Sequence, residues 1–293
     1  MNFSEMTFKA FIKRLSRVAL IPKVQRGIIA LEREEDIVSK ELVKVLKEIL
    51  ENLTDSEEKV WINRIESLRK ELNASGEEIS IVDYGAGSPA LNFTNEQMYE
   101  GRVVIQTIGD VCRQASKSYL SSFLLFKLIR QFRPSICLEL GTCLGISTSY
   151  QAAALKLNQL GRIVTLEGSE SLGLLAQKHF QALELDNVNI VFGRFQDTLD
   201  KVMNAYKPIN YAFIDGHHDE KATLFYFEQI CPFLSEKAVL VFDDISWSRG
   251  MKKAWRVIAT DKRVKISVDL RTMGICLIDS SIPQKPPFQI PIL

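Results

Sequence analysis

The fold of this chain follows first from one segment, Leu138-Glu139-Leu140-Gly141-Thr142-Cys143-Leu144-Gly145-Ile146-Ser147. An apolar run of strand length enters a glycine-rich loop, and a helical pattern leaves it. Glycine allows a tight turn and a close approach to a ligand, and the free N–H groups at the start of the next helix suit a carboxylate or a phosphate. A tight turn without a ligand would use the same glycines. The segment therefore predicts a strand–loop–helix unit and, by itself, only favours a binding site.

The same alternation continues from residue 134 almost to the end of the chain. Strands that are apolar along their whole length indicate a parallel sheet covered by helices on both faces. We therefore expect a doubly wound α/β sheet that closes with a pair of strands. The predicted strands are 135–140, 162–166, 188–192, 211–214, 238–242, 264–270 and 274–278, and the predicted helices are 147–157, 171–183, 197–205, 222–231 and 251–259.

Ligands of such sheets bind at the carboxyl ends of the strands, so the residues that follow each strand are the candidates for a site. Glu167 ends the second strand, and an acid about 20 residues beyond the glycine loop is where ribose hydroxyls are held. Phe195 and Gln196 follow the third strand, where an aromatic ring can stack on a base and an amide can bond to its edge. The alternative for this segment is a helix start capped by Asp197, with Phe195 in the core.

The fourth and fifth strands end in an unusual concentration of ionisable side chains. Asp215-Gly216-His217-His218-Asp219 follows the fourth strand, and Asp243-Asp244 follows the fifth. Like charges held close together are costly unless a cation or a proton compensates them. Carboxylate-rich sites suit Mg²⁺, Ca²⁺ or Mn²⁺. Helix capping is the alternative, and it accounts for Asp219 and for one of the two acids at the fifth strand, but not for Asp215 as well.

The first part of the chain has a different pattern. Residues 1–31 are basic and carry apolar side chains at helical spacing, which predicts a helix that packs on the main domain; contact with a membrane surface is the alternative. Residues 32–53 and the segment after them predict a helical hairpin, with Thr54 and Glu57 as the capping box of its second helix. Residues 79–88 look like a strand with a glycine loop, but Pro89 follows, so we interpret them as a turn or lid near the site.

Composition limits the class of protein. Among 293 residues, 37 Lys and Arg face 36 Asp and Glu, and this balance disfavours a chain built to coat nucleic acid. The five cysteines are scattered, which favours reduced thiols over disulfides or a zinc site. No apolar run approaches the roughly 20 residues that a membrane span needs. We expect a cytoplasmic protein without a transmembrane segment.

Taken together, these motifs resemble the class I S-adenosylmethionine-dependent methyltransferases. The similarity covers about residues 115–280 and is closest to small-molecule O-methyltransferases of the catechol and caffeoyl-coenzyme A type and to bacterial sugar O-methyltransferases. The resemblance implies a Rossmann-like sheet of seven strands with the last antiparallel. The N-terminal helical extension is expected from its own apolar pattern, since that region matches nothing in the catechol type. The resemblance implies S-adenosylmethionine contacts at Glu139, Gly141, Thr142, Gly145, Ser147, Glu167, Gly168, Phe195, Gln196 and Asp215.

The resemblance also implies a divalent metal on Asp215, Asp243 and Asp244, but two positions depart from the catechol type. Asp244 stands where that type has Asn, and His218 stands where it has its catalytic lysine. We therefore predict methylation of a small-molecule hydroxyl, with Mg²⁺ or another divalent ion assisting and His218 as general base, because its intrinsic pKa lies near neutrality. His217 is the second candidate for that base.

Three regions follow from these assignments. Residues 1–110 are expected to form a helical lid or homodimer arm, 111–282 the methyltransferase domain, and 283–293 an extended proline-rich tail. The alternative function is a non-catalytic protein that keeps the cofactor pocket and acts through its basic N-terminal helix. A nicotinamide dehydrogenase is disfavoured because the G-x-x-x-G spacing is not the dinucleotide fingerprint.

Overall fold

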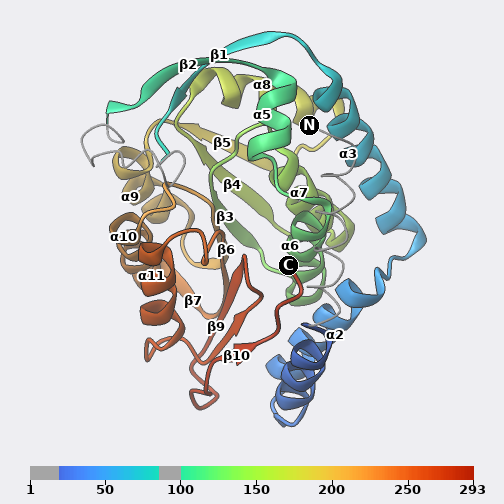
Figure 1. Cartoon of the computed structure of the whole chain (residues 1–293), viewed down its shortest axis with the longest axis vertical. Coiled ribbons are helices and arrows are strands. Elements are labelled where there is room, and N and C mark those ends of the chain that lie inside the picture. The colour runs from blue at the N-terminus through green and yellow to red at the C-terminus, as the bar shows by residue number, and fades with distance from the viewer. Residues whose placement is uncertain (1–19, 86–99) are drawn as a thin grey trace, which may run out of the picture.

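A computed structural model describes residues 20–85 and 100–293. In this part of the chain, the central sheet has eight strands in the order β10-β8-β9-β7-β6-β3-β4-β5 (Figure 1). Only β9 runs antiparallel to both of its neighbours. The Rossmann-like fold and its antiparallel last strand are therefore confirmed, with a short eighth strand added by the tail. The strands are β3 (Ile136–Leu140), β4 (Arg162–Glu167), β5 (Val188–Phe192), β6 (Ile209–Ile214), β7 (Leu234–Phe242), β8 (Ile266–Asp269), β9 (Gly274–Asp279) and β10 (Phe288–Gln289).

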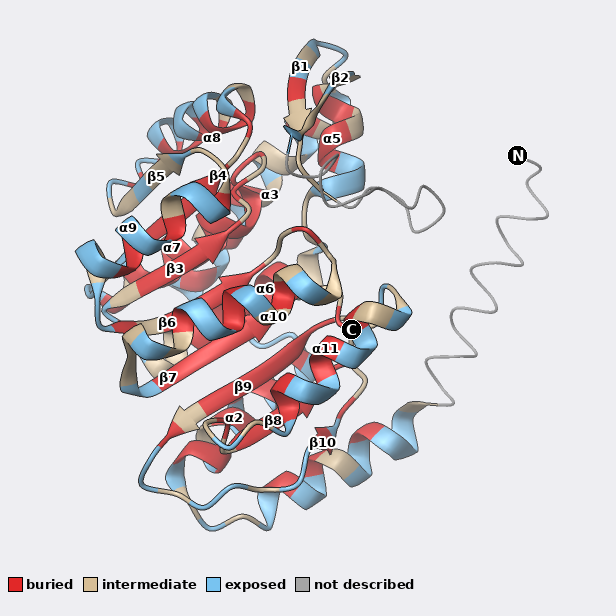
Figure 2. Ribbon diagram, turned by 90° about the vertical axis from the view of Figure 1, so that its left-hand side faces the viewer, coloured by how far each residue is buried: buried red, intermediate tan, exposed pale blue. Residues whose placement is uncertain are grey.

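Helices cover both faces of this sheet, as continuous apolar strands require. Alternate side chains of β3 enter two separate cores: Cys137 faces one, whereas Leu138 and Leu140 face the other. Figure 2 shows the inner strands buried along almost their whole length. The first core receives α6 (Tyr119–Phe132), α7 (Ile146–Asn158) and α8 (Glu170–Ala182), and the second receives α9 (Phe195–Tyr206), α10 (Glu220–Ile230) and α11 (Arg249–Ala259).

The N-terminal helices lie along one side of the domain rather than against each other (Figure 1). Residues 20–32 are helical, and α2 (Ile37–Glu51) and α3 (Ser56–Ala74) follow. Helix α2 packs on α6, whereas α3 packs on α7 and on α5 (Ile108–Ala115). The expected helical hairpin is therefore wrong: each apolar stripe finds its partner on the main domain.

The capping box of α3 lies one residue later than predicted. Asp55 accepts a hydrogen bond from the backbone N–H of Glu58 at 2.8 Å, and the carboxylate of Glu58 accepts one from the N–H of Asp55 at 3.2 Å. Thr54 and Glu57 had the same spacing, but the backbone is extended at Asp55 and helical from Ser56. A one-residue shift of this kind is common when a boundary is predicted from a pattern.

A two-stranded antiparallel hairpin interrupts the region expected to be helical. Strand β1 (Glu78–Asp83) pairs with β2 (Arg102–Thr107) and stands apart from the main sheet in Figure 2. The sequence indicated the first strand but not its partner. The glycine loop expected after β1 is described only as far as Gly85, and the first 19 residues of the basic N-terminal segment also lie outside the described part. Membrane-surface contact and homodimer formation stay predictions.

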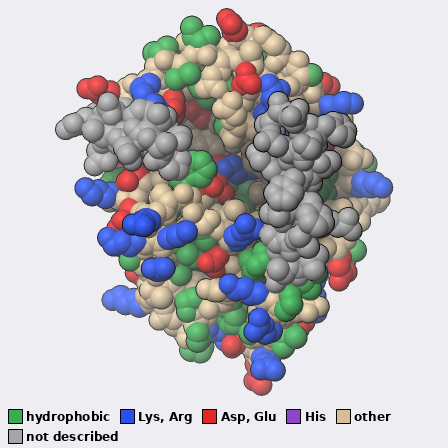
Figure 3. All heavy atoms as spheres, in the orientation of Figure 1, with side chains coloured by type: hydrophobic (Ala, Val, Ile, Leu, Met, Phe, Trp, Pro, Cys, Tyr) green, Lys and Arg blue, Asp and Glu red, His purple; other side chains and the backbone are tan. Residues whose placement is uncertain are grey.

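The tail crosses back to the N-terminal helices. It is extended and adds β10 beside β8, and the ammonium of Lys285 bonds to Glu34 and to Asp36, the latter at 2.8 Å. Basic side chains gather over the exposed side of α11, at the left of Figure 3 (Arg249, Lys252, Lys253 and Arg256). Within the described residues, no helix combines the length and apolarity needed to cross a membrane.

Candidate active site

A cavity of about 570 Å³ opens at the carboxyl ends of β3, β4, β6 and β7. This is the place where the topology of a doubly wound sheet puts its ligands, and the volume falls in the ordinary range for a small-molecule site. The opposite wall comes from β1 and from α5, which belong to the N-terminal region. Two parts of the chain therefore enclose one cavity.

The loop between β3 and α7 needs glycine at its first position. Gly141 has a φ of +101°, and a Cβ atom there would lie 2.2 Å from the carbonyl oxygen of Asp215. Gly145 is the N-cap of α7 and supplies no side-chain cap. The N–H groups in the first turn of α7 therefore receive no hydrogen-bond acceptor from the N-cap side chain. Free N–H groups at a helix start suit the carboxylate of a ligand.

Three predicted cofactor residues build this loop instead of lining the cavity. Glu139 is fully buried, and its carboxylate accepts hydrogen bonds from Ser147 Oγ at 2.8 Å, Thr165 Oγ1 at 2.7 Å, Gln151 Nε2 at 2.7 Å and Thr148 Oγ1. Burial raises the pKa of Glu139, and these four donors oppose that shift. Thr142 joins the same network, because its hydroxyl lies 2.6 Å from that of Thr165. Glu139, Thr142 and Ser147 are absent from the cavity wall.

Glu167 and Gly168, both predicted to contact the cofactor, lie in the cavity wall. One oxygen of Glu167 accepts from the N–H of Cys143 at 2.7 Å, and the other accepts from the N–H of Ser169 at 2.8 Å. Burial raises the pKa of this carboxyl group, while the backbone N–H groups act in the opposite direction. These backbone N–H groups fix the carboxylate in the cavity wall.

The aromatic segment after β5 is only partly exposed to the cavity. The Phe195 ring reaches the wall, but Gln196 does not; its amide lies 3.3 Å from Nε2 of His217. The hydroxyl of Tyr226 lies 2.8 Å from Nδ1 of the same imidazole. Burial, with a contribution from His218, lowers the pKa of His217 to about 4. His217 is therefore neutral and held at both nitrogens, which makes it a poor acceptor of a substrate proton.

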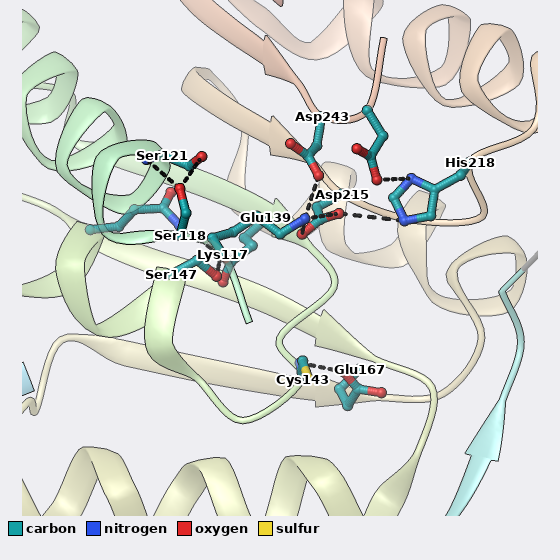
Figure 4. Close-up of polar contacts among 12 residues, drawn as sticks. Lys117, Ser118, Ser121, Glu139, Cys143, Ser147, Glu167, Asp215, His218 and Asp243 are labelled. Atoms are coloured by element: carbon teal, nitrogen blue, oxygen red, sulfur yellow. Dashed lines mark hydrogen bonds and ion pairs between the residues drawn. The ribbon is translucent and has the colours of Figure 1, made fainter. Parts of the chain in front are cut away.

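The acidic residues after β6 and β7 come together, as their positions predicted, but with a lysine between them. The ammonium of Lys117 lies 3.0 Å from Oδ2 of Asp215 and is also bonded to Oδ2 of Asp243 (Figure 4). Burial lowers the pKa of Lys117, but the two carboxylates outweigh this and raise it. Burial raises the pKa of Asp215, and Lys117 opposes that shift. Sequence reasoning missed Lys117 because it lies 98 positions before Asp215; the one signal was the need for a compensating cation.

His218 lies on the other side of Asp215 (Figure 4). Its Nε2 is 3.7 Å from Asp215 Oδ1, and its Nδ1 is 3.5 Å from Asp244 Oδ2. Burial lowers the pKa of His218, while the neighbouring acids raise it. The imidazole lines the cavity beside Trp247, whose side chain is 44% exposed.

This arrangement does not fit the divalent ion that the sequence analysis predicted. An ammonium group already occupies the space between Asp215 and Asp243 (Figure 4). No group of three acidic, histidine or cysteine side chains in the described residues is arranged to hold a metal ion. Asp244 turns toward His218 instead.

A family model supports the methyltransferase resemblance over part of the chain. Residues 138–245 match a family model described as a methyltransferase domain. Solved structures similar to this chain include an O-methyltransferase from Bacillus cereus in complex with SAH, at 25% identity and a TM-score of 0.49. The match covers 57% of this chain and 84% of the Bacillus cereus chain. The O-methyltransferase TomG from Streptomyces achromogenes, in complex with SAM, is similar at 21% identity and a TM-score of 0.48, with 56% and 82% covered.

A third similar structure is described as a caffeoyl-CoA O-methyltransferase from Staphylococcus aureus, at 17% identity and a TM-score of 0.50, with 58% of this chain and 88% of that chain covered. At this identity the likeness concerns the fold. No curated protein sequence matches the chain. The matched segment, residues 138–245, contains the glycine loop, Glu167 and the acidic strand ends, whereas the expected bounds of the domain, 111–282, stay a prediction.

Proposed function

We propose that this protein transfers a methyl group from S-adenosylmethionine to a hydroxyl group of a small molecule. The observation that carries the proposal is the division of one cavity into two chemically different sides. Gly141, Glu167 and Gly168 line one side, and Lys117, Asp215 and His218 line the other. The first set suits the cofactor, and the second set suits a hydroxyl that must lose a proton.

On the cofactor side, the chain offers one acceptor and one set of donors. In the proposed complex, the fixed carboxylate of Glu167 accepts from the ribose hydroxyls, and the uncapped N–H groups at the start of α7 donate to the carboxylate of the methionine part. Bound S-adenosylmethionine supplies a methyl group already activated on a sulfonium sulfur. The protein then has to supply alignment and a deprotonated oxygen.

On the acceptor side, His218 is the proposed general base. It lines the cavity, and Asp215 and Asp244 lie close to its two ring nitrogens. In the proposed reaction the acceptor oxygen attacks the methyl carbon, the carbon–sulfur bond breaks, and the hydroxyl proton passes to His218. The products are a methyl ether and S-adenosylhomocysteine. Trp247, exposed at the cavity, offers an apolar face to the rest of the acceptor.

A calorimetric titration with S-adenosylmethionine tests this proposal. We expect one site of micromolar affinity in the unchanged protein. Gly141→Val is expected to abolish binding, because the new side chain meets the backbone of Asp215. Gly76→Val is the matched control, since a Cβ atom there has no neighbour within 4 Å, and it should bind normally. Absence of binding to the unchanged protein would contradict the proposal and favour a non-catalytic role.

A further inference from the structure

The most unusual feature of the cavity is a lysine in the position expected for a metal ion. The Nζ atom of Lys117 lies 3.1 and 3.0 Å from the two carboxylate oxygens of Asp215 and is bonded to Asp243. The three side chains are only 15%, 12% and 5% exposed, respectively. Figure 4 shows the ammonium directed between the two acids. A single positive charge therefore bridges the strand ends β6 and β7.

The chain holds this lysine in a rigid place. Lys117 lies in the short link between α5 and α6, and a serine terminates the helix on each side: Ser116 is the C-cap of α5, and Ser118 is the N-cap of α6. The carbonyl oxygen of Lys117 accepts a hydrogen bond from Arg69 of α3 at 2.6 Å. Because its backbone is fixed at three points, the ammonium is positioned before any ligand arrives.

The ammonium also has room to act on a ligand. It carries three N–H donors, the two carboxylates face it from the sheet, and Lys117 itself forms part of the cavity wall. A fixed positive charge beside the acceptor oxygen stabilises the negative charge that develops there as the proton leaves. A metal ion would supply the same stabilisation, but it would need the oxygens that Lys117 already occupies.

We propose that Lys117 is the resident cation of the acceptor side, which takes the place of a divalent metal and binds the acceptor oxygen. This inference rests on the proposed function, since it assigns a role within the same site. It extends the site beyond residues 138–245, because Lys117 comes from the link that precedes the matched domain.

Manganese binding, followed by electron paramagnetic resonance of free Mn²⁺, tests the inference without any knowledge of the acceptor. The unchanged protein should leave millimolar Mn²⁺ free. Lys117→Met removes the ammonium and exposes the carboxylates of Asp215 and Asp243. This variant should therefore bind Mn²⁺ at least about tenfold more tightly than the unchanged protein does. Lys201→Met, which removes an exposed lysine of α9, is the matched control and should behave as the unchanged protein. If Lys117→Met fails to fold, Lys117→Gln replaces it with the same expected result.

Two results would overturn the inference. Stoichiometric Mn²⁺ binding by the unchanged protein would show that the lysine yields its place to a metal. Absence of Mn²⁺ binding in the folded variant would show that these carboxylates form no cation site. Calorimetry with S-adenosylmethionine on the same samples distinguishes failure of the proposed function from failure of the inference about Lys117. If the unchanged protein does not bind the cofactor, the proposed function is contradicted. The Mn²⁺ result bears only on the role of Lys117.

Discussion

Two adjacent histidines, His217 and His218, have different surroundings and therefore different chemistry. His217 is held by Tyr226 and Gln196 and belongs to an aromatic cluster with Phe195. His218 faces Asp215 and Asp244 in the cavity. Both imidazoles follow the same strand in the sequence, which named His218 first and His217 second as base candidates. Their hydrogen-bond partners support the same order on physical grounds.

At this scale, His218→Asn tests the proposed base. The substitution keeps a polar side chain of similar size but removes the imidazole that accepts the proton. We expect kcat to fall by about 100-fold or more, which is the usual contribution of a general base. The affinity for S-adenosylmethionine should stay unchanged, because His218 lies on the acceptor side. Normal turnover in this variant would contradict the assignment.

At the scale of elements, the sequence was most informative where an apolar pattern continues over a whole strand or helix. The order of strands and helices after residue 134 agrees with the structure because each segment has its own apolar pattern. The strand β2 was missed, since its apolar residues Val103 and Ile105 are exposed and its partner lies about 20 positions away. Lys117 was missed for a similar reason: a contact between a helix link and two strand ends leaves no local signal.

The junction of β3 and α7 is another element that the sequence described only in part. Glu139 was assigned to the cofactor, but the structure places it below the loop, where it joins Ser147, Thr148, Gln151 and Thr165. The motif is therefore informative about the loop, and its acid acts by fixing the start of α7 against β3. Backbone pattern alone does not distinguish a residue that lines a cavity from one that supports it.

Glu139→Gln tests this supporting role. The NH2 group of the new amide would face hydroxyl or amide donors that now bond to the carboxylate. Hydrogen bonds to a charged group are each worth about 1.5–3 kcal/mol. We expect the free energy of unfolding, measured by urea denaturation, to fall by about 2 kcal/mol. Glu236→Gln, at an exposed position of β7, is the matched control and should cause no change. Equal stability of the two variants would count against the network.

At the scale of the whole molecule, the N-terminal helices and the sheet domain form a single body held by buried ion pairs. Lys127 of α6 is 5% exposed, and its ammonium lies 2.6 Å from Glu58 of α3 and 3.0 Å from Glu48 of α2. Arg130 bonds to Glu58 as well, at 3.1 Å. The region that also contains α5 and β1 is thereby attached to the domain whose cavity it closes. This attachment is what lets residues outside the matched segment shape the site.

Lys127→Met tests the attachment. It removes the positive charge shared by two acids, and the loss of one partner of a buried pair costs about 3–5 kcal/mol. We expect a loss near the lower limit, about 3 kcal/mol, because Arg130 continues to neutralise Glu58. Lys201→Met, on the surface of α9, should change stability by less than about 0.5 kcal/mol. Denaturation followed by tryptophan fluorescence measures both, and similar midpoints would contradict the role of Lys127.

The cavity at the carboxyl ends of β3 and β4 is the proposed cofactor site, and a crystal structure of the protein with S-adenosylhomocysteine is the decisive measurement. We expect electron density for one molecule between Gly141 and Glu167, with the ribose hydroxyls bonded to the carboxylate of Glu167. Density at another place, or an empty cavity at saturating ligand, would contradict it.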